Sequence, residues 1–382
     1  MAKTLIGSTH RLGILGGGQL GRMFIQSAIN FDIHVHIMEN TPSAPSSACA
    51  TTYTQGDITD YDDVVNFGAT MDVVTVEIEN VNIEALKELE RRGVRVYPQP
   101  HVLEIIKDKG LQKSFYATHA IPTSAFELVP ENPSIDYLKA KIPFVQKLRT
   151  GGYDGKGVQV VSRVDQLDAC FKEPSIIEEL VPFEKEISII VARNASGETA
   201  VYPSVECEFN EANLVAFLFS PAEIPTVIEQ VAEKLAIEVI TKLDMVGILA
   251  VEMFLTTDGQ LLVNEVAPRP HNSGHHTIES NICSQFEQHL RSILNLPLGS
   301  TKMIQYGAMI NLIGEPGYEG QAHYIGFEEA LKHPGVHVHL YGKETTKSNR
   351  KMGHVTVTSD VLSDAKRVAH ILKNSLKVIS QQ

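Results

Sequence analysis

The first hundred residues alternate short apolar runs with helical patterns, and this alternation limits the fold more than any other feature of the sequence. The apolar runs are LGIL, IHVHIME, DVVTVE and VRVY, and the helical patterns between them include GRMFIQSAINF and IEALKELERRG. Strands that alternate with helices are typical of βαβ units, which form a parallel sheet. We therefore predict an α/β, Rossmann-like domain over residues 1–105, ending near Pro98 and Pro100.

The rest of the chain predicts two further domains. Residues 106–298 mix helical patterns with strand-like runs such as FVQKL, SIIEEL and EISIIVAR, which is typical of an α+β domain with antiparallel sheet. Residues 299–382 contain short strand-like runs and turns, closed by the helical pattern SDAKRVAHILKNSLKVI. We predict a small β-rich domain there. A chain of 382 residues is long enough for such a division.

The composition excludes several classes of function. A formal net charge of −13 argues against a general binder of nucleic acids or membrane surfaces, so an anionic ligand must meet a local basic cluster. The four cysteines, Cys49, Cys170, Cys207 and Cys283, contain no C-x-x-C pair and indicate neither a zinc site nor a disulfide framework. Without a signal-peptide pattern or an apolar run of about 20 residues, the sequence predicts a cytoplasmic protein.

A first glycine-rich loop, GGGQLG, fits the pattern G-x-G-x-x-G at Gly16, Gly18 and Gly21. It follows a strand-like run and precedes a helical pattern, and Glu39 ends the next strand-like run, which is the context of a dinucleotide site. The same glycines would also admit another phosphorylated ligand to a helix N-terminus, or only allow the helix to pack on the strand. The sequence leaves all three interpretations open.

A second glycine-rich loop, KLRTGGYDGKGV, extends from Lys147 to Val158. It is not a P-loop, because Lys156 is followed by Gly157 where a P-loop has a hydroxyl residue that contacts magnesium. A metal must therefore be bound elsewhere in the chain. Lys147 interrupts an apolar strand-like run, and because a buried lysine needs a partner we favour a phosphate for it.

Two glutamates are the candidate metal ligands. Asp258 and Gly259 lie between two apolar runs and indicate a hairpin. A two-residue turn there pairs Thr257 with Gln260 and, further along, Glu252 with Glu265. Directly opposed carboxylates destabilise a sheet unless they share a proton or a cation. An all-oxygen site favours magnesium, with manganese as the alternative.

The neighbours of this pair favour an interior site. Ile248, Ala250, Leu261 and Val263 share the parity of the two glutamates, so an exposed hairpin face is the less favourable interpretation. The loop APRPHNSGHH that follows is rich in polar residues and is a candidate substrate loop. Its two adjacent histidines, His275 and His276, lack the i, i+4 spacing of a helical zinc motif.

These segments, taken in order, resemble the ATP-grasp superfamily in its biotin-carboxylase-like, three-domain arrangement. The resemblance is carried by GGGQLGRM, KLRTGGYDGKG, EELV, NEVAPRPHNSGH and RKMGHVTV, and it covers essentially the whole chain. Within the superfamily the chain is similar to the ATP-dependent carboxylases of purine biosynthesis, the 5-(carboxyamino)imidazole ribonucleotide synthetases. The resemblance implies ATP, bicarbonate and 5-aminoimidazole ribonucleotide as substrates, Mg²⁺ as cofactor, a homodimer, and a following mutase that receives the product.

The resemblance also implies roles for individual residues. ATP would be bound by Lys109, Lys147, Gly151, Gly152, Tyr153, Asp154, Gly155, Lys156, Gly157, Glu178, Glu179, Leu180, Val181, Glu186, Asn264 and Glu265. Glu252 and Glu265 would hold the metal. The imidazole ribonucleotide would meet Gln19, Leu20, Glu77, Tyr153, Asp154 and Lys156, with its phosphate on Lys343, Arg350 and Lys351. Arg269, His271 and Asn272 would face the bicarbonate-derived group and, with Tyr153 and Asp154, form the catalytic set.

Three features depart from the family pattern. Phe209 stands near the place of a histidine that often contacts ATP, and Ala267 stands where many ATP-grasp proteins have an asparagine. Strand parity also places Asn264 on the face opposite Glu265, so the two reach one metal only if the strand bends. The alternative enzyme is a formate- and ATP-dependent glycinamide ribonucleotide transformylase, which GGYDGKG and PRPHN argue against. A nicotinamide-dependent dehydrogenase and a catalytically silent nucleotide-binding module leave the paired glutamates unexplained.

Overall fold

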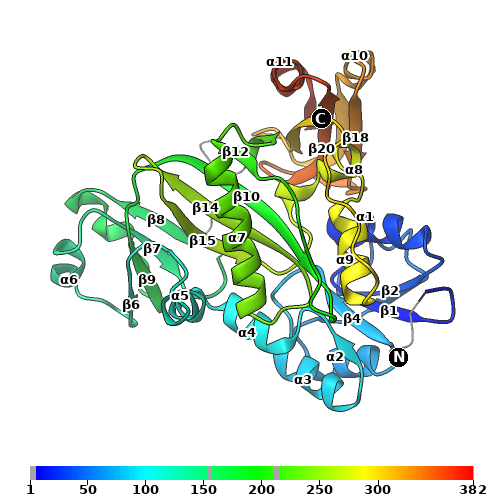
Figure 1. Cartoon of the computed structure of the whole chain (residues 1–382), viewed down its shortest axis with the longest axis horizontal. Coiled ribbons are helices and arrows are strands. Elements are labelled where there is room, and N and C mark those ends of the chain that lie inside the picture. The colour runs from blue at the N-terminus through cyan, green and yellow to red at the C-terminus, as the bar shows by residue number, and fades with distance from the viewer. Residues whose placement is uncertain (1–5, 153–156, 210–214, 382) are drawn as a thin grey trace.

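The structure is a computed structural model that describes residues 6–152, 157–209 and 215–381. Figure 1 shows a large central sheet in green, a smaller sheet in teal on one side of it, and the blue N-terminal and orange-to-red C-terminal regions on the other. The mixture of a parallel α/β region with α+β regions confirms the predicted fold class.

A five-stranded parallel sheet in the order β3-β2-β1-β4-β5 forms the N-terminal region. Its elements are β1 (Arg11–Leu15), α1 (Gln19–Ile29), β2 (His34–Glu39), β3 (Thr52–Gln55), α2 (Tyr61–Gly68), β4 (Val73–Val76), α3 (Ile83–Arg91) and β5 (Arg95–Val96). Alternate strand residues face opposite sides, so Leu12 and Ile14 pack with α1 while Leu15 and Val76 pack with α2 and α3.

A four-stranded antiparallel sheet in the order β6-β9-β7-β8 forms the teal region of Figure 1. Its elements are β6 (Phe126–Val129), α6 (Ile135–Lys139), β7 (Phe144–Leu148), β8 (Val158–Val161), the 3₁₀ helix Val164–Ala169 and β9 (Ser175–Glu179). Two helices, α4 (Pro100–Lys107) and α5 (Lys109–Thr118), connect it to the N-terminal region. The carboxylate of Asp108 caps α5 by accepting from the backbone N–H groups of Gly110 and Leu111.

A nine-stranded antiparallel sheet in the order β15-β14-β10-β12-β13-β16-β20-β18, with β11 paired to β10, joins the central and C-terminal regions. Its strands are β10 (Phe183–Arg193), β11 (Thr199–Val201), β12 (Val205–Phe209), β13 (Val215–Ser220), β14 (Gly247–Thr256), β15 (Leu261–Ala267), β16 (Tyr306–Ile313), β18 (Val336–Leu340) and β20 (Lys351–Ser359). Because β13 pairs with β16, this sheet crosses residue 298, and the predicted domain limits 1–105, 106–298 and 299–382 stay predictions.

Two helices cover opposite faces of β10 and β14. The long helix α7 (Thr226–Lys242) packs on odd-numbered residues such as Ile189 and Val251, each fully buried. The even-numbered residues of these strands face the other side, where α9 (Gln285–Ile293) packs between β14 and α1. Each buried aliphatic side chain contributes about 1.5–3 kcal/mol, so a one-residue slip in this sheet is strongly opposed.

The C-terminal region completes the fold with a three-stranded sheet and a helix. Its further elements are β17 (Gly320–Ile325), α10 (Phe327–Ala330), β19 (Thr345–Thr346), α11 (Leu362–Ser375) and β21 (Lys377–Ser380), and a short helix α8 (Thr277–Ser280) precedes α9. The helix α11 packs on β16 and β20 through residues such as Ala365 and Leu372. Among the described residues, no helix combines the length and apolar character that a membrane crossing requires.

Candidate functional site

The β14–β15 hairpin places Glu252 directly opposite Glu265, which confirms the predicted pairing. The predicted two-residue turn is wrong, because Thr256 bonds Gln260 (N to O, 2.9 Å) across a three-residue turn and Met253 pairs with Val263. A β-bulge between Val263 and Glu265 then restores the register. The longer turn shifts the register by one residue and the bulge shifts it back, so Glu252 still lies opposite Glu265.

Asn264 is the extra residue of this bulge. A bulge bends its strand and redirects the side chain, and here the Oδ1 atom of Asn264 accepts from the Nζ atom of Lys147 at 2.8 Å. This is the bend that the parity argument required. The bulge also moves Leu261 and Val263 to the α7 side of the sheet, so the prediction that they share the face of the two glutamates is wrong.

The two opposed carboxylates differ in their partners. Lys109, at the first position of α5, forms an ion pair with Glu265. Its ammonium holds the pKa of Glu265 well below the usual range, although burial acts in the opposite direction. Burial, together with the charge of Glu265, raises the pKa of Glu252. Among the described residues, the nearest basic group to Glu252 is the Nε2 atom of His271, at 3.4 Å. The two glutamates therefore share one ion-paired lysine, Lys109, between two carboxylates.

The residues at this position fit a hard divalent cation. Two opposed carboxylates supply oxygen ligands. Burial and the negative charge of Glu265 raise the pKa of Glu252 even though Lys109 and Lys147 act in the opposite direction, so a further cation would stabilise its ionised form. Within the described residues, no group of three or more histidine, cysteine, aspartate or glutamate side chains could hold a metal. Magnesium suits such a two-carboxylate site, because it keeps waters and substrate phosphates as its remaining ligands.

Lys147 lies between the two sheets, with its Nζ atom 3.0 Å from Glu178 Oε1 and 2.8 Å from Asn264 Oδ1. Glu178 is 2% exposed, and a second lysine, Lys113, lies 3.1 Å from its Oε2 atom. Burial opposes ionisation of Glu178, but the two lysines and the Ser124 hydroxyl lower its pKa. A protein carboxylate therefore satisfies Lys147, and a phosphate is not needed to explain its burial.

The second glycine-rich loop joins β7 to β8 and is anchored at its base. The guanidinium of Arg149 binds the carboxylate of Asp108 with two N–H groups, at 2.6 Å and 2.9 Å, and its carbonyl accepts from the backbone N–H of Lys109. Gly151 and Gly157 have φ of +78° and +80°, a conformation that side chains disfavour. Tyr153, Asp154, Gly155 and Lys156 lie outside the described residues.

The predicted adenine-binding segment, Glu178 to Val181, begins in the last two residues of β9. Glu179 and Leu180 are exposed, Val181 is half-buried, and Glu186 lies on β10 opposite Phe254. Burial raises the pKa of Glu186 to about 7. Glu186, Ser188 and Glu252 share one face of the sheet by strand parity, and Ser188 lies directly opposite Glu252. Phe209 ends β12 with 40% of its surface exposed.

Glu77 occupies the N-terminus of α1 in the first glycine-rich loop. Its carboxylate accepts from the backbone N–H groups of Gly18 and Leu20, where a dinucleotide-binding protein would place a pyrophosphate. A Cβ atom at Gly18 would lie 2.5 Å from Glu77 Oε1. Glu39 is likewise engaged, accepting from Gly17 at 3.1 Å. The glycines thus admit a protein carboxylate, and the geometry disfavours the dinucleotide interpretation.

The loop after β15 carries the predicted catalytic side chains. Arg269 pairs with Glu79 at 3.0 Å, and Asn272 exchanges two hydrogen bonds of 2.9 Å with Asn311. The buried amide of Gln285 binds the backbone N–H and carbonyl of His271 at 2.9 Å and 2.8 Å. These contacts fix the loop beside Glu252. His275 and His276 are buried, and burial lowers the pKa of both.

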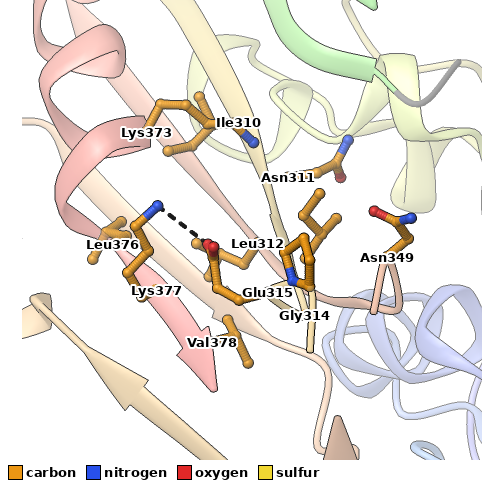
Figure 2. A pocket seen from close by; sticks show the side chains of 12 residues that line it. Ile310, Asn311, Leu312, Gly314, Glu315, Asn349, Lys373, Leu376, Lys377 and Val378 are labelled. Carbon is orange, nitrogen blue, oxygen red and sulfur yellow. Dashed lines mark ion pairs between the residues drawn. The ribbon is translucent and has the colours of Figure 1, made fainter. Parts of the chain in front are cut away.

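The predicted phosphate residues lie in the C-terminal region. Lys343 donates to the carbonyl of Lys351 at 2.7 Å, and Arg350 donates to the carbonyl of Thr345 at 2.7 Å. A cavity of about 220 Å³ lies next to these residues. Figure 2 shows that Asn349 and the ion pair of Lys377 with Glu315 are among its lining side chains. No predicted site residue lines this cavity, so the cavity is not the predicted phosphate site.

Sequence reasoning missed several residues that hold the site together. They are Asp108, Lys113, Ser124, Arg149, Glu79, Asn311 and Gln285. Asp108 carries one usable signal, since Asp is favoured at a helix N-cap and a lysine follows it. The others act through contacts between segments that are far apart in sequence, for which no local pattern exists.

Three family models match the chain in succession. They describe a ribonucleotide synthetase preATP-grasp domain over residues 9–107, an ATP-grasp domain over 114–286 and a phosphoribosylaminoimidazole carboxylase C-terminal domain over 307–368. A phosphoribosylaminoimidazole carboxylase of Ogataea methanolica is 36% identical over 387 residues, covering 97% of this chain and 70% of that relative.

Solved structures give the same result. The N5-carboxyaminoimidazole ribonucleotide synthetase of Thermotoga maritima matches with a TM-score of 0.90 and 39% identity, over 97% of this chain and 100% of that chain. The N5-carboxyaminoimidazole synthase of Aspergillus clavatus, solved with ADP and 5-aminoimidazole ribonucleotide, matches with a TM-score of 0.87 and 32% identity, over 96% and 98%. The agreement extends over all regions of the chain.

Proposed function

The chain belongs to the N5-carboxyaminoimidazole ribonucleotide synthetase family of ATP-grasp enzymes, and we propose that it uses ATP and bicarbonate to carboxylate 5-aminoimidazole ribonucleotide. The products are N5-carboxyaminoimidazole ribonucleotide, ADP and phosphate. The observation that carries the proposal is the opposed pair Glu252 and Glu265, with Lys109 paired to Glu265 and Lys147 bonded to the adjacent Asn264.

The reaction proceeds in two steps. A bicarbonate oxygen attacks the γ-phosphorus of ATP, and the bond between this phosphorus and the β,γ-bridging oxygen breaks. The products of this step are ADP and carboxyphosphate. The exocyclic amine of the imidazole then attacks the carboxyl carbon of carboxyphosphate, or CO₂ released from it. Phosphate leaves and the amine loses a proton, so the atoms balance. Such transfers need positioning and charge neutralisation more than a protein nucleophile.

The charged side chains of the site suit the first step. The ammonium groups of Lys109 and Lys147 are held by carboxylate or amide oxygens and would neutralise phosphate charge as the γ-phosphoryl group moves. We place bicarbonate near His271 and Arg269, on the loop that Gln285 fixes beside Glu252. A magnesium ion held by Glu252 and Glu265 would supply positive charge to the phosphate oxygens.

We propose that the second substrate binds between the N-terminal and C-terminal regions. Glu77, Gln19 and Leu20 would meet the imidazole and ribose, and Lys343, Arg350 and Lys351 would meet the 5′-phosphate. A compact basic cluster in a chain with a net charge of −13 supports this assignment. Carboxyphosphate hydrolyses readily, so the loop from Gly151 to Gly157 is proposed to exclude water once ATP is bound.

The remaining assignments rest on family membership. We propose magnesium as the metal, with manganese as a substitute, a homodimer as the working form, and the cytoplasm as the location. The product would pass to the mutase that follows in purine biosynthesis. The net negative charge supports small-molecule substrates over nucleic acids or membranes as partners.

One assay tests the function. ADP release is measured with purified protein, magnesium and bicarbonate, after addition of either 5-aminoimidazole ribonucleotide or glycinamide ribonucleotide with formate. Stimulation by the first addition alone is the expected result. Stimulation by the second alone would instead assign the formate-dependent transformylase, and stimulation by neither would overturn the enzymatic proposal.

A further inference from the structure

Lys113 is a buried lysine for which the sequence predicts no role. It lies on α5, one helical turn after Lys109, and only 2% of its surface is exposed. Its Nζ atom donates to Thr123 Oγ1 at 2.6 Å and to Ser124 Oγ at 2.9 Å. It also lies 3.1 Å from Glu178 Oε2. The ammonium group therefore has two hydrogen bonds and one ion pair, all with protein groups.

These contacts join the two walls of the proposed nucleotide site. Glu178 belongs to β9 of the four-stranded sheet, which carries the adenine segment and the glycine-rich loop. Thr123 donates to the carbonyl of Val263 at 2.6 Å, and Val263 donates its N–H to Pro122 at 2.8 Å. Val263 belongs to β15 of the nine-stranded sheet and immediately precedes Asn264 and Glu265. Lys113 thus bridges the carboxylate of Glu178 and, through Thr123, the strand that carries the proposed metal ligand Glu265.

Lys113 also determines how Lys147 is held. The Oε2 atom of Glu178 is taken by Lys113 and the Ser124 hydroxyl, at 3.1 Å and 2.6 Å, which leaves Oε1 for Lys147 at 3.0 Å. Lys147 then reaches Asn264 with a second N–H group. Removal of Lys113 would leave Glu178 with one cation in a buried position, where an uncompensated charge is costly.

The charge of Lys113 is maintained by its ion pair with Glu178. Burial lowers the pKa of Lys113 to about 8, although Glu178 acts in the opposite direction. A charged lysine that is retained at 2% exposure is costly for stability alone, since well-packed apolar residues are often as stable as a buried ion pair. A positional role explains why a charge is present here.

We propose that Lys113 is a positioning residue that fixes the spacing between the two walls of the nucleotide site, acting through Glu178 on Lys147 and through Thr123 on the β15 bulge. This inference rests on the proposed function, because it takes ATP to be the ligand that binds between the four-stranded and the nine-stranded sheet. Lys113 itself does not touch the nucleotide. A purely structural role would lower the thermal stability without changing the affinity of the folded protein for nucleotide.

The first test is a comparison of Lys113→Met with wild type. Isothermal titration calorimetry with Mg·ADP should show a dissociation constant raised on the order of tenfold, which equals about 1.4 kcal/mol. The KM for ATP should rise equally, while kcat at saturating ATP and the KM for 5-aminoimidazole ribonucleotide change by less than about twofold. Lys185→Met is the matched control, because it also removes a lysine from a carboxylate, that of Glu206 at 2.7 Å. This variant should bind ADP as wild type does.

A double-mutant cycle tests the route through Glu178. If Lys113 acts through Glu178, the variant Lys113→Met with Glu178→Gln should bind ADP no more weakly than Glu178→Gln alone. Should Lys113→Met fail to fold, Thr123→Val carries the test, because it removes the link from Lys113 to β15 and should weaken ADP binding severalfold. Unchanged ADP affinity in the folded variants, or strictly additive effects, would overturn the inference. Failure of wild type to bind Mg·ADP would instead overturn the proposed function.

Discussion

Two carboxylate sites lie on facing sheets of this molecule, and they solve the same electrostatic problem in opposite ways. Glu178 is surrounded by two lysines and a serine hydroxyl, so every favourable partner comes from the protein. Glu252 and Glu265 face each other, and one lysine, Lys109 of α5, forms an ion pair with Glu265. In the first arrangement the protein itself supplies two cations for one carboxylate. The second has one ion-paired lysine for two carboxylates, which supports the proposal that Glu252 and Glu265 hold a metal ion.

Replacement of Glu265 by Gln should have the largest effect on activity and little effect on the fold. Loss of one opposed charge relieves repulsion with Glu252 but removes a proposed metal ligand, so turnover should fall on the order of 10³-fold. Two effects on stability oppose each other, because Lys109 loses its ion-pair partner while Glu252 loses a like charge. Circular dichroism should therefore match wild type, and the melting temperature should change little. Glu238→Gln, an exposed change on α7, is the control. Near-wild-type turnover of Glu265→Gln would refute the metal assignment.

Replacement of Glu178 by Gln should show the reverse pattern in stability. It leaves Lys113 and Lys147 near each other without their shared carboxylate, and breaking a buried pair from one side costs about 3–5 kcal/mol. The measurement is the melting temperature of both glutamate variants in one buffer. A Glu178→Gln protein as stable as Glu265→Gln would show that the two sites do not differ as described.

The sequence allowed most of the parallel N-terminal sheet to be predicted, because β1, β2, β4 and β5 each have an apolar pattern of their own. The polar edge strand β3 and the helix α2 were not predicted. It also placed Glu252 opposite Glu265, although the turn was predicted wrongly. The bulge at Asn264 could not be predicted, since no local preference marks an asparagine as the extra residue of a strand. The partners of Lys147 and Glu77 were missed for a related reason. Both are satisfied by residues more than thirty positions away, and such contacts appear only when separate elements pack.

Replacement of Gly18 by Ala tests the carboxylate at the first glycine-rich loop. The new Cβ atom would lie 2.5 Å from Glu77 Oε1, whereas at Gly21 the nearest atom would be 3.6 Å away. Overpacking of this kind costs about 1–3 kcal/mol, so Gly18→Ala should lower the melting temperature and raise the KM for 5-aminoimidazole ribonucleotide. Gly21→Ala, in the first turns of α1, is the matched control and should be tolerated. Equal behaviour of the two variants would mean that Glu77 does not need close approach.

The smallest effect concerns acid stability at the contact between the N-terminal region and α9. His289 is 1% exposed, its Nε2 atom is 2.9 Å from Thr75 Oγ1, and burial lowers its pKa to about 3. The unfolded chain binds a proton at this residue below about pH 6.5 and the folded chain does not, so stability present above pH 6.5 is lost as the pH falls. The slope is about 1.4 kcal/mol per pH unit for one such group. His289→Gln should therefore lose melting temperature less steeply than wild type between pH 6.5 and 5, although it starts lower. Exposed His34→Gln should keep the wild-type slope, and parallel curves for all three proteins would show that His289 is protonated in the folded state.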